Sequence, residues 1–120
     1  MRQMLLNRIT ATLVVIFVLT AIGFSITRTR PAGAQDAVSQ GQNIFKNNCA
    51  QCHHADTAEP LFGPGLAGLF ERSELPASKR AVTEKNVTRQ LTDPVGTMPS
   101  FSDRLSEDEL EAVVDYLKTL

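Results

Sequence analysis

Two cysteines and a histidine constrain this chain more than any other feature. Cys49 and Cys52 are its only cysteines, and His53 follows directly, so Cys49-Ala50-Gln51-Cys52-His53 is a C-x-x-C-H pentapeptide. On a helix-like turn, residues at i and i+3 share one face, so both thiols can reach the vinyl groups on one edge of a porphyrin. The histidine then offers its imidazole to the iron. We interpret the pentapeptide as the attachment site of one covalent haem c, with Cys49 and Cys52 as thioether residues and His53 as an axial iron ligand.

Other uses of these side chains fit the pattern less well. A redox-active dithiol is expected beside a strand–helix pattern, and no alternating apolar strand precedes Cys49. A structural zinc ion needs four well-spaced ligands, whereas Cys49, Cys52, His53 and His54 are crowded together and the chain has no other Cys or His. A Cys49–Cys52 disulfide in an exported, haem-free module is the third alternative, but it would close a very short loop and add little stability.

A methionine between prolines is the candidate for the second axial ligand. Met1 and Met4 lie at the N-terminus, which leaves Met98 as the only thioether beyond residue 34. The prolines at 94 and 99 exclude an uninterrupted helix there and predict a stiff loop. The alternative is a methionine that fills a gap in the core. Axial His53 and Met98 would favour ferrous iron and leave no open coordination position, which suits electron transfer better than catalysis. We therefore predict no catalytic residue and no enzyme activity.

Residues 1–34 have the features of a targeting segment. Arg2 and Arg8 precede a largely apolar run over residues 9–26, and Ala32 and Ala34 stand at the −3 and −1 positions of a cleavage site after Ala34. We predict a signal peptide over residues 1–34 and one domain over residues 35–120. A retained membrane anchor is the alternative, since 18 residues would span roughly 27 Å as a helix. Either segment sends the domain across a membrane, so we expect a periplasmic or otherwise exported protein, or one anchored facing the periplasm.

The charge of the domain restricts its partners. Residues 1–34 contain four of the twelve basic residues and none of the thirteen acids, so the remainder has a formal charge of −5 against −1 for the whole chain. An acidic surface argues against a nucleic-acid partner and leaves a basic docking partner open. The simpler interpretation is that the charge only keeps a small domain soluble.

Helical patterns flank the pentapeptide. Residues 36–48 place Val38, Gly41, Ile44 and Phe45 on one side of a predicted helix, and Gly41 suggests a close helix–helix contact. A short helix is predicted over residues 84–92, before Pro94. Ser106-Glu107-Asp108-Glu109 is a capping box that starts the last helix. A Gly/Pro loop over residues 63–68 leads into a short apolar stretch.

The order of these features resembles the small bacterial class I cytochromes c, over residues 36–120. The motifs that carry the resemblance are Gly41 and Phe45, Cys49-Ala50-Gln51-Cys52-His53, Gly63-Pro64-Gly65-Leu66, Thr97-Met98-Pro99-Ser100-Phe101, and the last helix with Tyr116 and Leu117. The resemblance implies an all-α fold in which three main helices and Gly/Pro loops surround one haem, with the first and last helices crossing. It also implies that the carbonyl of Pro64 accepts a hydrogen bond from the Nδ1–H of His53. The chain lacks the Trp that many members of the family have.

These features predict an electron carrier. Single electrons would pass between a donor and an acceptor redox protein outside the cytoplasm, by way of an exposed haem edge. The membrane would be involved only through an uncleaved N-terminal anchor. If Met98 does not ligate or is displaced, the alternative is a haem peroxidase or a sensor of small ligands.

Overall fold

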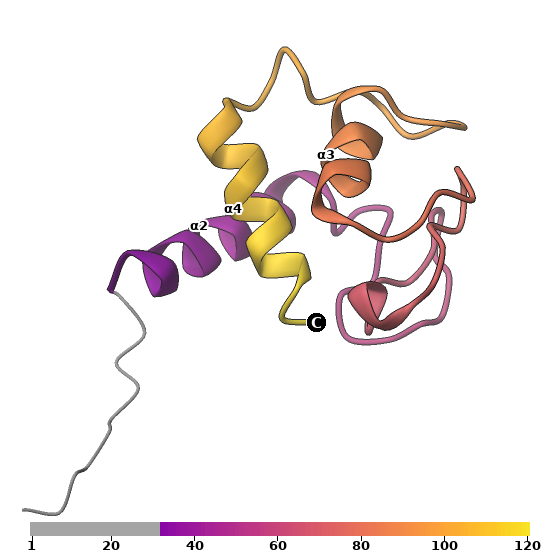
Figure 1. Ribbon diagram of the computed structural model, residues 1–120, viewed down its shortest axis with the longest axis horizontal. Coiled ribbons are helices and arrows are strands. Elements are labelled where there is room, and N and C mark those ends of the chain that lie inside the picture. Colours follow the sequence, from indigo (N-terminus) through magenta and orange to yellow (C-terminus); the bar gives the residue numbers. More distant parts are fainter. Residues whose placement is uncertain (1–31) are drawn as a thin grey trace, which may run out of the picture.

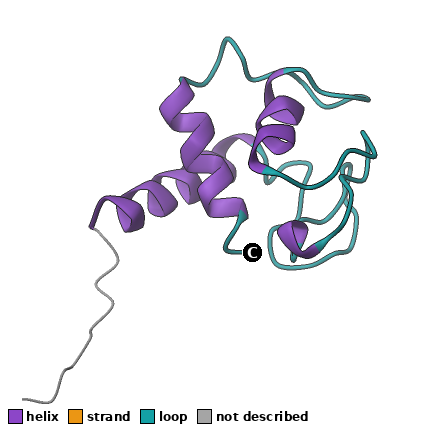
Figure 2. Cartoon of the chain, in the orientation of Figure 1, coloured by secondary structure: helices purple, strands orange, loops and turns teal. Residues whose placement is uncertain are grey.

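The computed structural model describes residues 32–120, and these fold into helices joined by long loops (Figures 1 and 2). The α-helices of this part are α2 (Ala32–Asn48), α3 (Glu84–Thr92) and α4 (Glu107–Leu117), and a 3-10 helix, η1 (Leu69–Glu71), lies in the loop before α3. Over the same residues the β pairing is limited to an isolated antiparallel bridge between Glu74 and Ala81. The predicted all-α fold with three main helices is confirmed.

Helices α2 and α4 cross at the centre of the core (Figure 1). Gly41 is buried at the crossing, where a Cβ atom would overlap the carbonyl oxygen of Ala112 and lie 2.9 Å from the Cβ of Tyr116. The rings of Phe45 and Tyr116 pack beside it with centroids 5.5 Å apart. Val113, on the inner face of α4, is 1% exposed. The close approach that Gly41 predicted from the sequence is therefore present.

Local capping signals set where α3 and α4 begin. The Thr83 hydroxyl accepts a hydrogen bond from the backbone N–H of Asn86 at 3.2 Å, and α3 runs over the residues predicted for it. At the start of α4, Ser106 accepts from the Glu109 N–H at 3.3 Å, while the Glu109 carboxylate accepts from the Ser106 N–H at 2.9 Å. Each bond satisfies an N–H that the first turn leaves without a partner.

Helix α2 begins at Ala32, four residues before the predicted start at Asp36. The added residues are Ala, Gly, Ala and Gln; only the glycine opposes a helix appreciably, by about 1 kcal/mol. The predicted start was wrong because residues 32–35 contain neither a capping residue nor an apolar pattern that marks an earlier start. The predicted leader lies outside the described residues except for residues 32–34, which belong to α2. None of the helices between residues 32 and 120 is both long and apolar enough to cross a membrane.

The loops lie mostly on one side of the crossed helices, beside α3 (Figure 2). Arg72 braces the first of them: its guanidinium donates to the carbonyl oxygens of Gly65 at 2.9 Å and Ala67 at 2.7 Å. Lys118 forms ion pairs with Glu84 and Asp115, each at 2.8 Å; the pair with Glu84 joins the start of α3 to the end of α4. Arg72 thus stabilises the loop through its own backbone, while Lys118 links two helices.

Candidate functional site

The C-x-x-C-H pentapeptide continues the last turn of α2. The carbonyl oxygen of Phe45 accepts from the backbone N–H groups of Cys49 at 2.8 Å and Ala50 at 3.0 Å. The carbonyl of Cys49 in turn accepts from the N–H groups of Cys52 and His53, both at 3.0 Å. These bonds wind the backbone tightly after the helix ends. The turn expected from the spacing of the motif is present, with both cysteines as free thiols.

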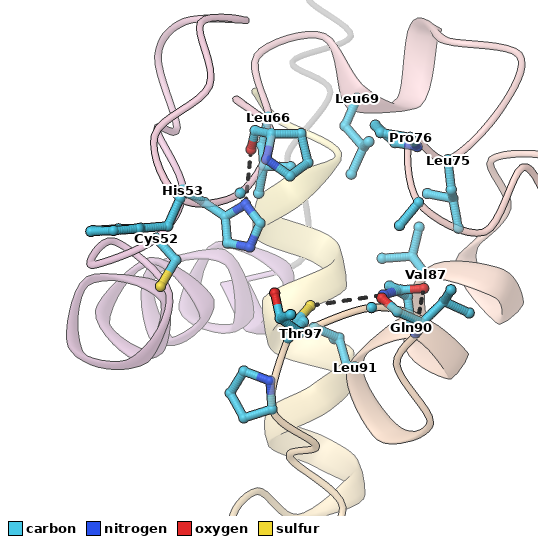
Figure 3. Close-up of a pocket in the computed structure, with 18 of the residues that line it drawn as sticks. Cys52, His53, Leu66, Leu69, Leu75, Pro76, Val87, Gln90, Leu91 and Thr97 are labelled. Atoms are coloured by element: carbon cyan, nitrogen blue, oxygen red, sulfur yellow. Dashed lines mark hydrogen bonds between the residues drawn. The ribbon is translucent and has the colours of Figure 1, made fainter.

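One nitrogen of the His53 ring is hydrogen-bonded to the backbone of the Gly/Pro loop. Nδ1 lies 2.8 Å from the carbonyl oxygen of Pro64. A carbonyl oxygen can only accept, so Nδ1 carries the proton and Nε2 keeps its lone pair. In Figure 3 the ring extends into a cavity between the loops and α3. The arrangement leaves Nε2 as the ring atom that can bind a metal.

Met98 enters the same cavity from the other side, on a loop that we call the methionine loop (residues 93–101). Its neighbour Thr97 and the His53 ring extend into the cavity from separate segments (Figure 3). The loop is fixed to α3 where Phe101 N–H donates to the Leu91 carbonyl at 2.9 Å and the Ser100 hydroxyl donates to the Thr92 carbonyl at 2.6 Å. The break in the helix predicted from the prolines is present, and these bonds attach the loop around Met98 to α3.

Gln90 holds the middle of the methionine loop. Its side-chain amide donates to the Val95 carbonyl at 3.3 Å and accepts from the Val95 N–H at 3.5 Å. The amide nitrogen also lies 4.0 Å from the sulfur of Met98, a contact drawn as a dashed line in Figure 3. One side chain thus ties both backbone groups of Val95 to α3 and faces the thioether.

The cavity that these residues share has a volume of about 320 Å³. Leu66, Leu69, Leu75, Val87 and Leu91 supply much of its wall, and no Asp, Glu, Lys or Arg lines it. Its polar lining includes an imidazole from one wall and a thioether from another. A mostly apolar space with a nitrogen and a soft sulfur donor fits a haem, whose iron takes His and Met as axial ligands in cytochromes c.

The two cysteines lie in different surroundings. Cys52 is exposed and lines the cavity, whereas Cys49 is 7% exposed, belongs to the core cluster and is not part of the cavity wall. Burial, reinforced by the nearby Cys52 and opposed by Arg104, raises the pKa of the Cys49 thiol to about 11. As a free thiol Cys49 is thus neutral at pH 7, and conversion to a thioether removes its ionisation altogether.

The cavity therefore brings together four of the five residues singled out from the sequence: Cys52, His53, Pro64 and Met98. Cys49 lies one turn away at the end of α2. Gln90 was not predicted from the sequence, although it shares the spacing of Val87 and Leu91 and so lies on the same face of α3. Arg72 was not predicted either, because its role depends on contacts that spacing does not reveal.

Comparisons with known proteins identify the family. The Cytochrome c family model matches residues 38–120. The chain is 30% identical over 90 residues to cytochrome c2 of Rhodoplanes tepidamans, covering 62% of this chain and 92% of that protein. It is 31% identical over 99 residues to cytochrome c6 of Rippkaea orientalis, covering 82% and 84%.

A solved structure gives the same result for the fold. Cytochrome c6 from the diatom Phaeodactylum tricornutum superposes with a TM-score of 0.55 at 32% identity, covering 68% of this chain and 91% of that one. The fold, the pentapeptide and the family match together place the chain in the cytochrome c family, as a small class I electron carrier with one covalently bound haem c.

Proposed function

We propose that His53 and Met98 are the two axial ligands of the haem iron, and that Cys49 and Cys52 form the thioether bonds. When bound, the haem supplies a one-electron ferric/ferrous couple. His53 offers Nε2 because its Nδ1–H is committed to the Pro64 carbonyl at 2.8 Å, which also fixes the plane of the ring. The observation that carries the proposal is the convergence of His53 and Met98, from segments 45 residues apart in sequence, on one apolar cavity.

With both axial positions filled by protein, the chain would act as a carrier and not as a catalyst. A soft thioether stabilises ferrous iron and raises the reduction potential relative to two histidines. The cavity wall contributes no formal charge and no acid–base group other than His53 and the thiol of Cys52. Neither would be free to transfer protons, because the first would be bound to iron and the second would be a thioether.

The axial ligands are tested by the optical spectrum of the oxidised, haem-loaded protein. The methionine–iron charge-transfer band is expected in the wild type and in Thr97→Ala, a matched control in the same loop and the same cavity wall. It should vanish in Met98→Ala. A water-bound, high-spin resting state in the wild type would contradict the proposal and support a peroxidase or a ligand sensor.

The thioether residues are tested by haem staining on a denaturing gel after co-expression with the haem-attachment machinery. Wild-type protein should retain the stain, because covalent haem survives denaturation. Cys49→Ser together with Cys52→Ser should give a blank lane, with each single variant retaining one bond. An unstained wild-type band would contradict haem attachment and support the alternative, a haem-free module in which the two cysteines form a disulfide.

We further propose that the domain works outside the cytoplasm, between a donor and an acceptor redox protein. The support is the apolar, Ala-x-Ala-terminated segment over residues 1–34 and the formal charge of −5 that remains after it. Mass spectrometry of the exported chain checks this: a soluble protein starting at residue 35 is expected. An intact N-terminus in the membrane fraction would instead establish a retained anchor, and cytoplasmic protein alone would refute export.

A further inference from the structure

We propose that Gly63 is a positioning residue for the axial histidine. The absence of a side chain at this position lets the loop backbone lie directly against the His53 imidazole and so sets the orientation of the ring. The inference rests on the proposed ligation of iron by His53. Gly63 has no atom that binds iron, and its role is to leave room for the His53 ring.

The geometry at Gly63 leaves no room for a side chain. A Cβ atom there would overlap Cε1 of the His53 ring, and would lie 2.8 Å from Nδ1 and 2.9 Å from Nε2. All three atoms belong to the part of the ring between its nitrogens, which is the part that contains the proposed metal-binding atom. Because Gly63 is not in the left-handed region of backbone space, alanine could adopt its backbone conformation. The three nearest atoms that a Cβ would meet all belong to the His53 ring.

Neither the ring nor the loop can easily move aside. The ring is held by the bond from Nδ1 to the carbonyl of Pro64, the residue after Gly63. The backbone of Gly63 is held too: its N–H donates to the Cys52 carbonyl at 2.8 Å, and its carbonyl accepts from the Leu61 N–H at 2.9 Å. A methyl group must therefore turn the imidazole or break one of these bonds. Since Cys52 and His53 are adjacent, any shift acts on the haem-binding segment itself.

Turning the imidazole would change how its orbitals overlap with those of the iron. The orientation and hydrogen bonding of a metal-bound histidine tune the metal it binds. We expect Gly63→Ala to keep both axial ligands while altering the electronic structure of the haem. A residue that only packed the loop would lower stability and leave that electronic structure unchanged.

Gly65 provides the matched control. It lies in the same loop, also outside the left-handed region, and a Cβ there would overlap the carbonyl oxygen of Thr57 and lie 2.5 Å from that of Glu59. The clash at Gly65 is thus of similar severity but falls on the backbone of residues 57–59 and not on the His53 ring itself. Comparing Gly63→Ala with Gly65→Ala separates an effect on the imidazole from general damage to the loop.

The readouts are the haem ring-methyl resonances in the proton NMR spectrum of the ferric protein and the reduction potential. Gly63→Ala should reorder the methyl resonances and shift the potential. Gly65→Ala should lower the unfolding midpoint and keep the wild-type resonance pattern. A wild-type pattern and potential in Gly63→Ala, or equal changes in both variants, would overturn the proposal.

A measurement on the unmodified protein covers the case in which Gly63→Ala fails to take up haem. In the diamagnetic ferrous state, a strong nuclear Overhauser effect is expected between the Gly63 α protons and the His53 Hε1 proton, and its absence would refute the proposal. The wild-type optical spectrum reports separately on axial ligation. If His53 and Met98 do not ligate the iron, the wild-type spectrum will lack the methionine–iron band, whichever result the glycine variants give.

Discussion

Replacing Gly41 with alanine tests the crossing of α2 and α4. The added methyl would overlap the backbone carbonyl of Ala112, which cannot rotate away as a side chain can. Overpacking of a core costs about 1–3 kcal/mol, and a clash with fixed backbone belongs at the upper end of that range. Alanine recovers about 1 kcal/mol of helix propensity. The free energy of unfolding should therefore fall by about 2 kcal/mol, which lowers Tm by roughly 8–16 °C in a domain of this size.

The assay is guanidinium unfolding of the haem-loaded protein, followed by far-ultraviolet circular dichroism. Gln42→Ala is the control, because Gln42 is the exposed neighbour of Gly41 in the same helix. Its stability should stay within about 0.5 kcal/mol of wild type. If Gly41→Ala were as stable as wild type or more so, helix propensity alone would govern this position, and the close crossing of the two helices would be refuted.

Three further changes test the contacts that hold the loops and helix ends. Gln90→Leu removes both hydrogen bonds to the Val95 backbone and should lower the free energy of unfolding by about 1 kcal/mol. In an optical titration, added imidazole should then displace the methionine at a lower concentration than in wild type. An unchanged displacement concentration would show that Gln90 does not hold the methionine loop. Lys118→Met should cost about 0.5 kcal/mol near neutral pH. Hydrogen bonds to Asp115 and Glu84 raise the pKa of Lys118 from its ordinary 10.5. The stability that Lys118 contributes is therefore complete below pH 10.5 and is lost as the pH rises through the raised pKa. The urea midpoints of wild type and Lys118→Met should converge over that rise in pH. Ser106→Ala breaks the capping box and should lower stability by about 1 kcal/mol in the same assay.

The elements fixed by local signals were those that the sequence predicted best. Thr83 and Ser106 cap their helices through bonds within one turn, so the starts of α3 and α4 could be inferred from neighbouring residues alone. The bond between His53 and Pro64 was implied by family resemblance and is present at 2.8 Å. Gly41 could be interpreted because glycine inside a helix carries a cost that close packing explains.

Contacts between loops could not be predicted in this way. Gly63 lies against the His53 ring where two loop segments meet, and Gln90 lies beside the Met98 sulfur where the methionine loop meets α3, so both contacts depend on tertiary packing. The sequence places Gln90 on the same face of α3 as Val87 and Leu91, and Gly63 next to Pro64, but it does not show which side chain each would contact. The start of α2 at Ala32 was missed because the Ala, Gly and Gln residues before Asp36 give no pattern that marks the beginning of a helix.

The uncharged wall of the cavity has a consequence for the speed of electron transfer. Leucine and valine side chains carry no dipole that must turn when the charge of the iron changes, and the nearby Val95 and Gly65 backbone groups are held by Gln90 and Arg72. We therefore expect the surroundings to differ little between the oxidised and reduced protein, which would keep the reorganisation energy of the protein small. Such a centre can accept and release an electron over a small driving force in either direction.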